Sequence, residues 1–145
     1  MPIVYANIGS NLGNRKELIL SAIDKIYERF GICCISSFIE SDPWGFESEN
    51  RFLNLGVSFK SSAEPEFILD ELQFIEKGIC SDSHRDEKGN YSDRKIDIDI
   101  MAIDDLKYQS QRLTLPHHHL LSRDFFLIPL QELNPELYLI LNNGI

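Results

Sequence analysis

The sequence is poor in cysteine and in basic residues. Its 145 residues include three cysteines, two of them adjacent, so we expect no disulfide framework and a reducing compartment, the cytoplasm. Only 14 lysines and arginines stand against 23 aspartates and glutamates, which gives a formal net charge of −9. Because a general nucleic-acid binder needs a basic surface to displace counterions from phosphates, we expect no nucleic-acid partner.

Long apolar runs are missing as well. The most apolar stretch, residues 125–130, is far too short to span a bilayer and contains a proline. The first residues lack the basic and apolar regions of a secretion signal. We therefore expect a cytoplasmic monomer with no membrane partner.

Repeats and flexible linkers are absent too, so a single domain over residues 1–145 is predicted. Strands are predicted at 2–8, 32–40, 52–60 and 93–100, with a short piece at 106–108. Helices are predicted at 14–30, from Pro65 onward with Phe67, Ile68, Leu72 and Ile75 buried, and near 125–133. The order β-α-β-β-α-β predicts an α+β fold, a ferredoxin-like sandwich with helices packed on an antiparallel sheet.

The segment "DRKIDIDI" (93–100) places two carboxylates on one face of a predicted strand. The Cα atoms of Asp97 and Asp99 would lie roughly 6.5–7 Å apart, a spacing suited to hard cations such as Mg²⁺. A solvated polar face is an equally weighted alternative. Arg94 and Lys95 precede the pair and would offer positive charge to an anionic substrate.

Two further segments are weaker signals of phosphate binding. The turn "IGSNLGN" (8–14) could turn backbone N–H groups toward phosphate, although it matches no established phosphate-loop pattern and a plain turn is favoured. The run His117–His119 is not expected to bind zinc, because consecutive side chains diverge in a helix or a strand. Arg112, His117 and Arg123 could instead form a local cationic cluster.

An aromatic group is the last candidate site. Trp44 and Phe46 precede Phe52, and Asn54 follows on the same face of its strand. A flat heterocycle needs a stacking surface and a donor–acceptor group at its edge, which an Asn amide supplies. Packing in the core is the alternative, above all for Phe52.

Taken together, these motifs resemble one family. "IGSNLGN", "DPWGFESENRFLN", "DRKIDIDIM" and "LTLPHHHLLSRDFFLIPL" occur in the order and spacing of 6-hydroxymethyl-7,8-dihydropterin pyrophosphokinases of the folate pathway. The resemblance implies a ferredoxin-like fold and transfer of the β,γ-pyrophosphoryl group of ATP to the pterin hydroxymethyl oxygen, releasing AMP. It also implies two Mg²⁺ ions between the protein and the phosphates of ATP.

The resemblance assigns roles to individual residues. The catalytic set is Asp97, Asp99, Arg94 and Arg123, with Asp97 and Asp99 as the metal ligands. The pterin set is Asp42, Pro43, Trp44, Gly45, Phe52, Asn54 and Phe125. The ATP set is Gln73, Glu76, Arg85, Tyr91, Arg94, Ile100, Arg112, Thr114, His117, His118 and Arg123.

The polar segment 78–92 departs from the family pattern, which often has a Gly-Arg-x-Arg run there. We expect a loop, a candidate lid over ATP in which Arg85 takes over one arginine role. Two alternative functions stay open: a Mg²⁺-dependent phosphohydrolase that uses the same carboxylates, and a non-catalytic nucleotide-binding or interaction module.

Overall fold

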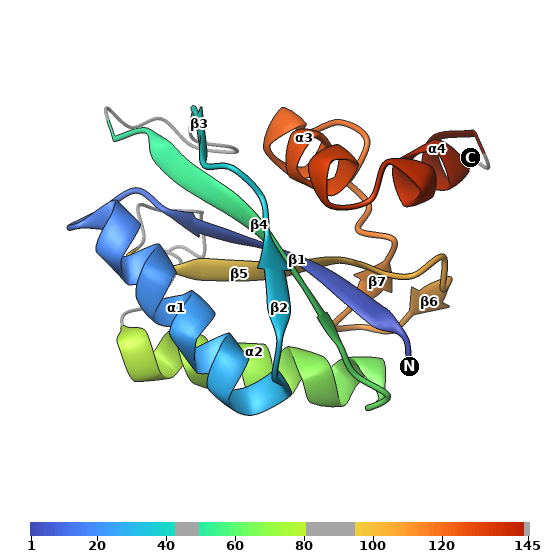
Figure 1. Cartoon of the computed structure of the whole chain (residues 1–145), viewed down its shortest axis with the longest axis horizontal. Helices are drawn as coiled ribbons and strands as arrows, with labels where there is room; N and C mark the ends of the chain where they lie inside the picture. The colour runs from blue at the N-terminus through green and yellow to red at the C-terminus, as the bar shows by residue number, and fades with distance from the viewer. Residues whose placement is uncertain (43–49, 81–94, 144–145) are drawn as a thin grey trace.

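A five-stranded antiparallel sheet forms the centre of the molecule (Figure 1). The computed structural model describes residues 1–42, 50–80 and 95–143. The strands are β1 (Ile3–Ser10), β2 (Cys33–Ile35), β3 (Ile39–Ser41), β4 (Phe52–Lys60) and β5 (Asp97–Ile103). Their order is β2-β4-β1-β5, and β3 also pairs with β4. A separate hairpin joins β6 (Tyr108–Gln109) to β7 (Thr114–Leu115).

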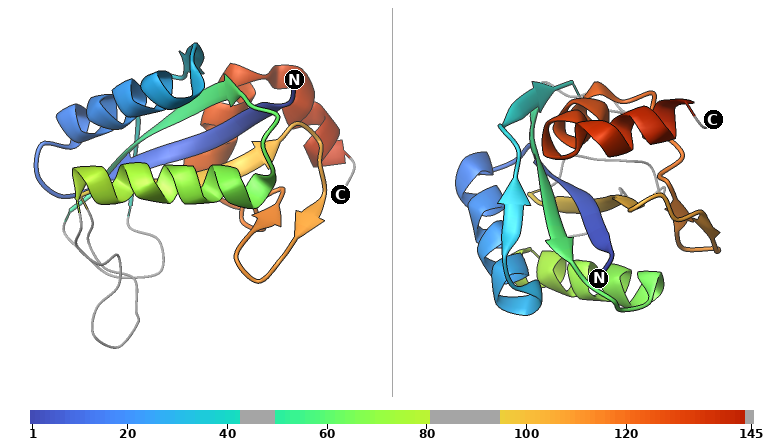
Figure 2. Two further views of the ribbon diagram at one scale, coloured as in Figure 1. Left: turned by 90° about the horizontal axis from the view of Figure 1, so that it is seen from below. Right: turned by 45° about the vertical axis from the view of Figure 1, so that its right-hand side comes forward.

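Helices cover both faces of this sheet. α1 (Arg15–Phe30) and α2 (Pro65–Ile79) pack on one face, and α3 (Asp124–Leu133) and α4 (Pro135–Asn143) lie on the other (Figure 2). α1 begins where the Asn14 side chain accepts a hydrogen bond from the Glu17 N–H at 3.3 Å. It ends at Gly31, whose φ of 89° suits glycine. The layers are therefore helices, sheet, helices.

Alternation along the strands assigns each side chain to one of these layers. In β1, Ala6 and Ile8 are fully buried against α1 and α2, whereas Tyr5 packs with α3 and α4. In β5, Ile98 and Ile100 belong to the α1/α2 core. Because successive strand residues point to opposite faces, Asp97 and Asp99, which alternate with those isoleucines, face the α3 side.

The predicted order of elements is confirmed, with differences in detail. The strand predicted at 32–40 is broken into β2 and β3. The Ser36 hydroxyl accepts from the Gly56 N–H at 2.8 Å, and the Ser37 N–H donates to Glu132 of α3 at 2.9 Å, which diverts the chain from regular pairing. Gly78 lies inside α2, so the predicted loop begins after Ile79.

Two predictions about the helices were wrong or incomplete. Phe67 of α2 was expected to be buried but is 48% exposed. α4 was not predicted, because its nine residues follow α3 after a single residue, Asn134. Within the described parts of the chain, no helix has the length and apolar character needed to cross a membrane.

Candidate active site

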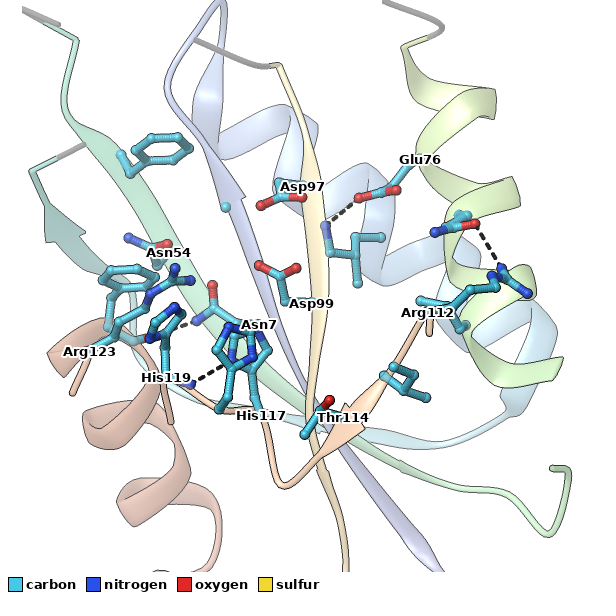
Figure 3. Close-up of a pocket in the computed structure, with 18 of the residues that line it drawn as sticks. Asn7, Asn54, Glu76, Asp97, Asp99, Arg112, Thr114, His117, His119 and Arg123 are labelled. Carbon is cyan, nitrogen blue, oxygen red and sulfur yellow. Dashed lines mark hydrogen bonds between the residues drawn. The ribbon is translucent and has the colours of Figure 1, made fainter. Parts of the chain in front are cut away.

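A pocket of about 490 Å³ lies on the sheet face between α3 and α2 (Figure 3). Strand register builds its floor. Asp97 pairs with Gly9, which pairs with Asn54, and Asp99 pairs with Asn7 in the next row. The neighbouring strands β5, β1 and β4 thus place Asp97, Gly9 and Asn54 side by side across the sheet.

Asp97 and Asp99 face this pocket from β5 (Figure 3). Ile98 points the other way into the core, and its N–H donates to the Glu76 carboxylate at 2.6 Å. Glu76 comes from α2 and is only 8% exposed. β5 is the last strand in the order of the sheet and so forms its edge. At this edge Glu76 accepts the N–H of Ile98, the residue between the two aspartates.

An aromatic and amide group forms one end of the pocket. Phe52, Asn54 and Phe125 line it there, and Asp42 lies at the rim with an ion pair to Arg51 at 3.4 Å. The Asn54 amide donates to the Ser41 hydroxyl at 2.8 Å, which fixes its orientation. Gly9 leaves room for the Asn54 side chain at this end of the pocket, because a Cβ on residue 9 would lie 3.0 Å from the Asn54 Oδ1 atom.

The three consecutive histidines all line the pocket, contrary to the expectation that they diverge. They lie in a turn rather than in a helix or a strand, and the ring centroids of His117 and His118 are 4.8 Å apart. The His117 Nδ1 atom accepts from the His119 N–H at 3.1 Å. The turn therefore presents a compact group of imidazoles to the pocket.

His117 does not carry the positive charge predicted for it. Burial, followed by the nearby Arg123 and the other two histidines, lowers the pKa of His117 to about 3. The ring is therefore neutral at pH 7. Desolvation, followed by Arg123 and His118, also lowers the pKa of His119.

The two arginines predicted to form a cluster with His117 lie at different places. Arg123 stands over the rings of Phe125 and Phe126, with centroid distances of 5.6 and 5.2 Å, at the aromatic end. Arg112 lies across the pocket beside α2, where it pairs with Asp70 and contacts Gln73 at 3.4 Å. Hydrogen bonding to Asp70 raises the pKa of Arg112.

Most of the residues assigned from the sequence line this one pocket. They are Asp42, Phe52, Asn54, Gln73, Glu76, Asp97, Asp99, Arg112, Thr114, His117, His118, Arg123 and Phe125. Ile100 does not line it and packs instead in the α1/α2 core, 3% exposed. Pro43, Trp44, Gly45, Arg85, Tyr91, Arg94 and the candidate lid beyond residue 80 lie outside the described residues.

Several lining residues were missed by the sequence interpretation. They are Asn7, Leu69, Ile98, Ser110, Gln111 and Leu113, whereas Gly9 and His119 lie in segments that the sequence analysis considered without assigning them a role. Asn7 and Gly9 carried a usable signal, since a polar residue and a glycine alternate with Ala6 and Ile8 in an otherwise apolar strand. Of the turn at 8–14, only Gly9 lines the pocket, and Asn14 caps α1, which favours the plain-turn interpretation.

The chemistry of the carboxylate pair fits Mg²⁺. No cluster of three His, Cys, Asp or Glu side chains that could enclose a metal occurs among residues 1–42, 50–80 and 95–143. Two carboxylates suffice for Mg²⁺, which keeps several waters and takes further oxygens from substrate phosphates. Asp97 and Asp99 would hold such an ion on the pocket side of β5.

The protein thus has an α+β fold whose sheet carries a pocket with two neighbouring carboxylates beside an aromatic and amide group. The sequence profile of the 7,8-dihydro-6-hydroxymethylpterin-pyrophosphokinase (HPPK) family matches residues 5–135. The chain belongs to this family.

Relatives agree with this assignment, and a solved structure shares the fold. The chain is 41% identical over 140 residues to a 2-amino-4-hydroxy-6-hydroxymethyldihydropteridine pyrophosphokinase of Porphyromonas gingivalis, covering 95% of each. It is 39% identical to the enzyme of the same name from Aquifex aeolicus, covering 93% of this chain and 82% of that one. A crystallised HPPK-DHPS protein shares the fold at 14% identity with a TM-score of 0.69 over 94% of this chain, which spans 42% of that longer protein.

Proposed function

We propose that this chain transfers the β,γ-pyrophosphoryl group of ATP to the hydroxymethyl group of 6-hydroxymethyl-7,8-dihydropterin, giving AMP and the pterin diphosphate in folate synthesis. Its membership in the pyrophosphokinase family supports this reaction. The observation that carries the proposal is one continuous pocket with the Asp97–Asp99 pair between two unlike ends (Figure 3).

The two ends suit two substrates. Phe52 and Phe125 offer aromatic faces for a pterin ring, and Asn54 offers a donor and an acceptor to its edge. At the other end, Gln73, Arg112 and Thr114 form a polar subsite for the nucleotide. A triphosphate lying between the ends would pass Asp97 and Asp99.

In this mechanism the protein aligns the reactants and neutralises charge. Two Mg²⁺ ions held by Asp97 and Asp99 would screen the phosphate oxygens and stabilise the charge that develops on transfer. The Arg123 guanidinium, over Phe125, would meet the transferred group near the pterin. The aromatic pocket would hold the hydroxymethyl oxygen in line with the β-phosphorus, so most of the rate gain would come from positioning.

We also propose the ferredoxin-like arrangement, a single domain and a monomeric state in the cytoplasm. The strand order β2-β4-β1-β5 with antiparallel pairing supports the first of these. Packing of both helical layers on one sheet supports the second. The proposed use of ATP supports the location, because ATP is an intracellular substrate.

One assay separates the candidate functions. Protein, ATP and Mg²⁺ are incubated with and without 6-hydroxymethyl-7,8-dihydropterin, and AMP and orthophosphate are quantified. AMP that forms only with the pterin is expected. Orthophosphate without the pterin would support the phosphohydrolase instead, and no turnover in either mixture would support a binding module.

A further inference from the structure

Asn7 is a polar residue in the middle of a buried strand. Its side chain is 3% exposed, and its neighbours Ala6 and Ile8 are fully buried in the α1/α2 core. A buried amide without hydrogen-bond partners destabilises the fold, so such a residue needs a compensating interaction. In β1 the Asn7 side chain points to the pocket face, in register with Asp99 on one side and Gly56 on the other.

The partner of Asn7 is a backbone carbonyl of α3 whose regular helical donor is missing. The Asn7 Nδ2 atom donates to the Phe125 carbonyl oxygen at 2.6 Å. In a regular helix this carbonyl would accept the N–H of the residue four positions on. That residue is Pro129, which lies inside α3 and has no N–H. Asn7 supplies the donor that the proline removes.

Gly56 completes the contact between α3 and the sheet. A Cβ on Gly56 would lie 2.6 Å from the Pro129 Cβ, closer than real side chains approach. Proline at position 129 can therefore rest on β4 only because residue 56 is glycine. We call Asn7, Gly56, Phe125 and Pro129 the α3 joint.

We propose that Asn7 is a positioning residue for the pterin, acting through the α3 joint. It fixes the backbone of Phe125, and so the ring on which the flat substrate would stack. Asn7 also lines the pocket beside the Asp97–Asp99 pair, so the joint ties the aromatic end to the metal-binding strand. This inference rests on the proposed function for its substrate and on the contacts of the α3 joint for its geometry.

The test uses the fact that Pro129→Ala gives α3 its own donor for the Phe125 carbonyl. Asn7→Ala is expected to raise the KM for 6-hydroxymethyl-7,8-dihydropterin about tenfold while the KM for ATP changes less than about twofold. In Asn7→Ala/Pro129→Ala the new N–H at residue 129 replaces the lost amide. The pterin KM should therefore return toward the value of Pro129→Ala alone.

Tyr5→Phe is the matched control. The Tyr5 hydroxyl accepts from the Asn134 amide at 2.8 Å, another partly buried hydrogen bond between β1 and the α3/α4 layer that does not involve Phe125. Its loss should lower stability and leave the pterin KM unchanged. An equal rise in pterin KM in Tyr5→Phe, an unchanged KM in Asn7→Ala, or no rescue in the double variant would overturn the inference.

Urea unfolding separates this inference from the proposed function. If Asn7 replaces the donor that Pro129 lacks, Asn7→Ala should lower the free energy of unfolding less in the Pro129→Ala background than in the wild type. This coupling is expected whether or not the wild type makes AMP. Strictly additive losses would refute the joint. Absence of AMP from the wild type with coupling intact would refute the proposed function instead.

Discussion

At the scale of single residues, the site depends on alternation in one short strand. Ile98 anchors β5 in the core, so Asp97 and Asp99 project together on the other face. Two like charges this close repel each other, and a bound cation relieves the repulsion. Binding of Mg²⁺ at this pair is therefore the part of the proposed mechanism that single substitutions can test.

Asp97→Ala is expected to lower the rate of AMP formation by about 10³-fold or more, because one of two metal-binding carboxylates is lost. The fold should stay intact, because Asp97 faces the pocket and not the hydrophobic core. Asp105→Ala is the control, because Asp105 is an exposed acid outside this pocket. Full activity in Asp97→Ala would favour the solvated-face interpretation.

His117 makes stability depend on pH. Its folded pKa of about 3 lies below the ordinary value of 6.5, so the unfolded chain binds the proton first as pH falls. The stabilisation is complete above pH 6.5 and is lost toward pH 3. Between pH 7 and pH 5 His117 should account for a loss of about 2 kcal/mol.

Urea unfolding of the wild type and of His117→Asn at both pH values measures this loss. The Asn Oδ1 atom can replace Nδ1 as the acceptor for the His119 N–H but does not titrate. The variant should therefore lose less stability on acidification. Equal losses in both proteins would show that His117 does not titrate as described.

At the scale of elements, hydrophobic periodicity predicts the helices and strands whose formation depends on burial. It misses the places where polar contacts with distant segments interrupt an element. α1 and the buried face of β5 follow apolar spacing closely. The break between β2 and β3 comes from Ser36 and Ser37 hydrogen bonds to distant elements, which local sequence does not reveal. The Asp97–Asp99 pair was visible from residue type and alternation, whereas the role of Gly9 depends on its register with Asn54.

Glu76 links α2 to β5 by accepting the Ile98 N–H, a hydrogen bond that we call the brace. Glu76→Ala removes the acceptor for the Ile98 N–H and should cost about 1–3 kcal/mol of stability. It should also raise the Mg²⁺ concentration needed for half-maximal activity, because the strand segment between the two aspartates loses its support. Glu76→Gln keeps an acceptor oxygen and should stay close to the wild type.

Amide exchange at Ile98 reports this brace directly. Faster exchange is expected in Glu76→Ala and near-normal exchange in Glu76→Gln. If both variants lost activity equally with unchanged exchange at Ile98, Glu76 would act through its charge and not as a brace.

At the scale of the whole molecule, the fold brings distant segments to one sheet face. β4 and α3 supply the aromatic end, β5 supplies the carboxylates, and α2 with the β6–β7 hairpin borders the nucleotide end (Figure 1, Figure 3). No single segment holds both proposed subsites. The activity should therefore require the folded sheet with both helical layers.

The fate of the phosphorus atoms tests the central claim most directly. The protein is given Mg²⁺, 6-hydroxymethyl-7,8-dihydropterin and ATP labelled in turn at the α, β or γ phosphorus, and the products are separated. We predict that β and γ labels move together into the pterin product and that the α label stays in AMP. Release of the γ label as orthophosphate, or transfer of the γ label without the β label, would contradict pyrophosphoryl transfer by this chain.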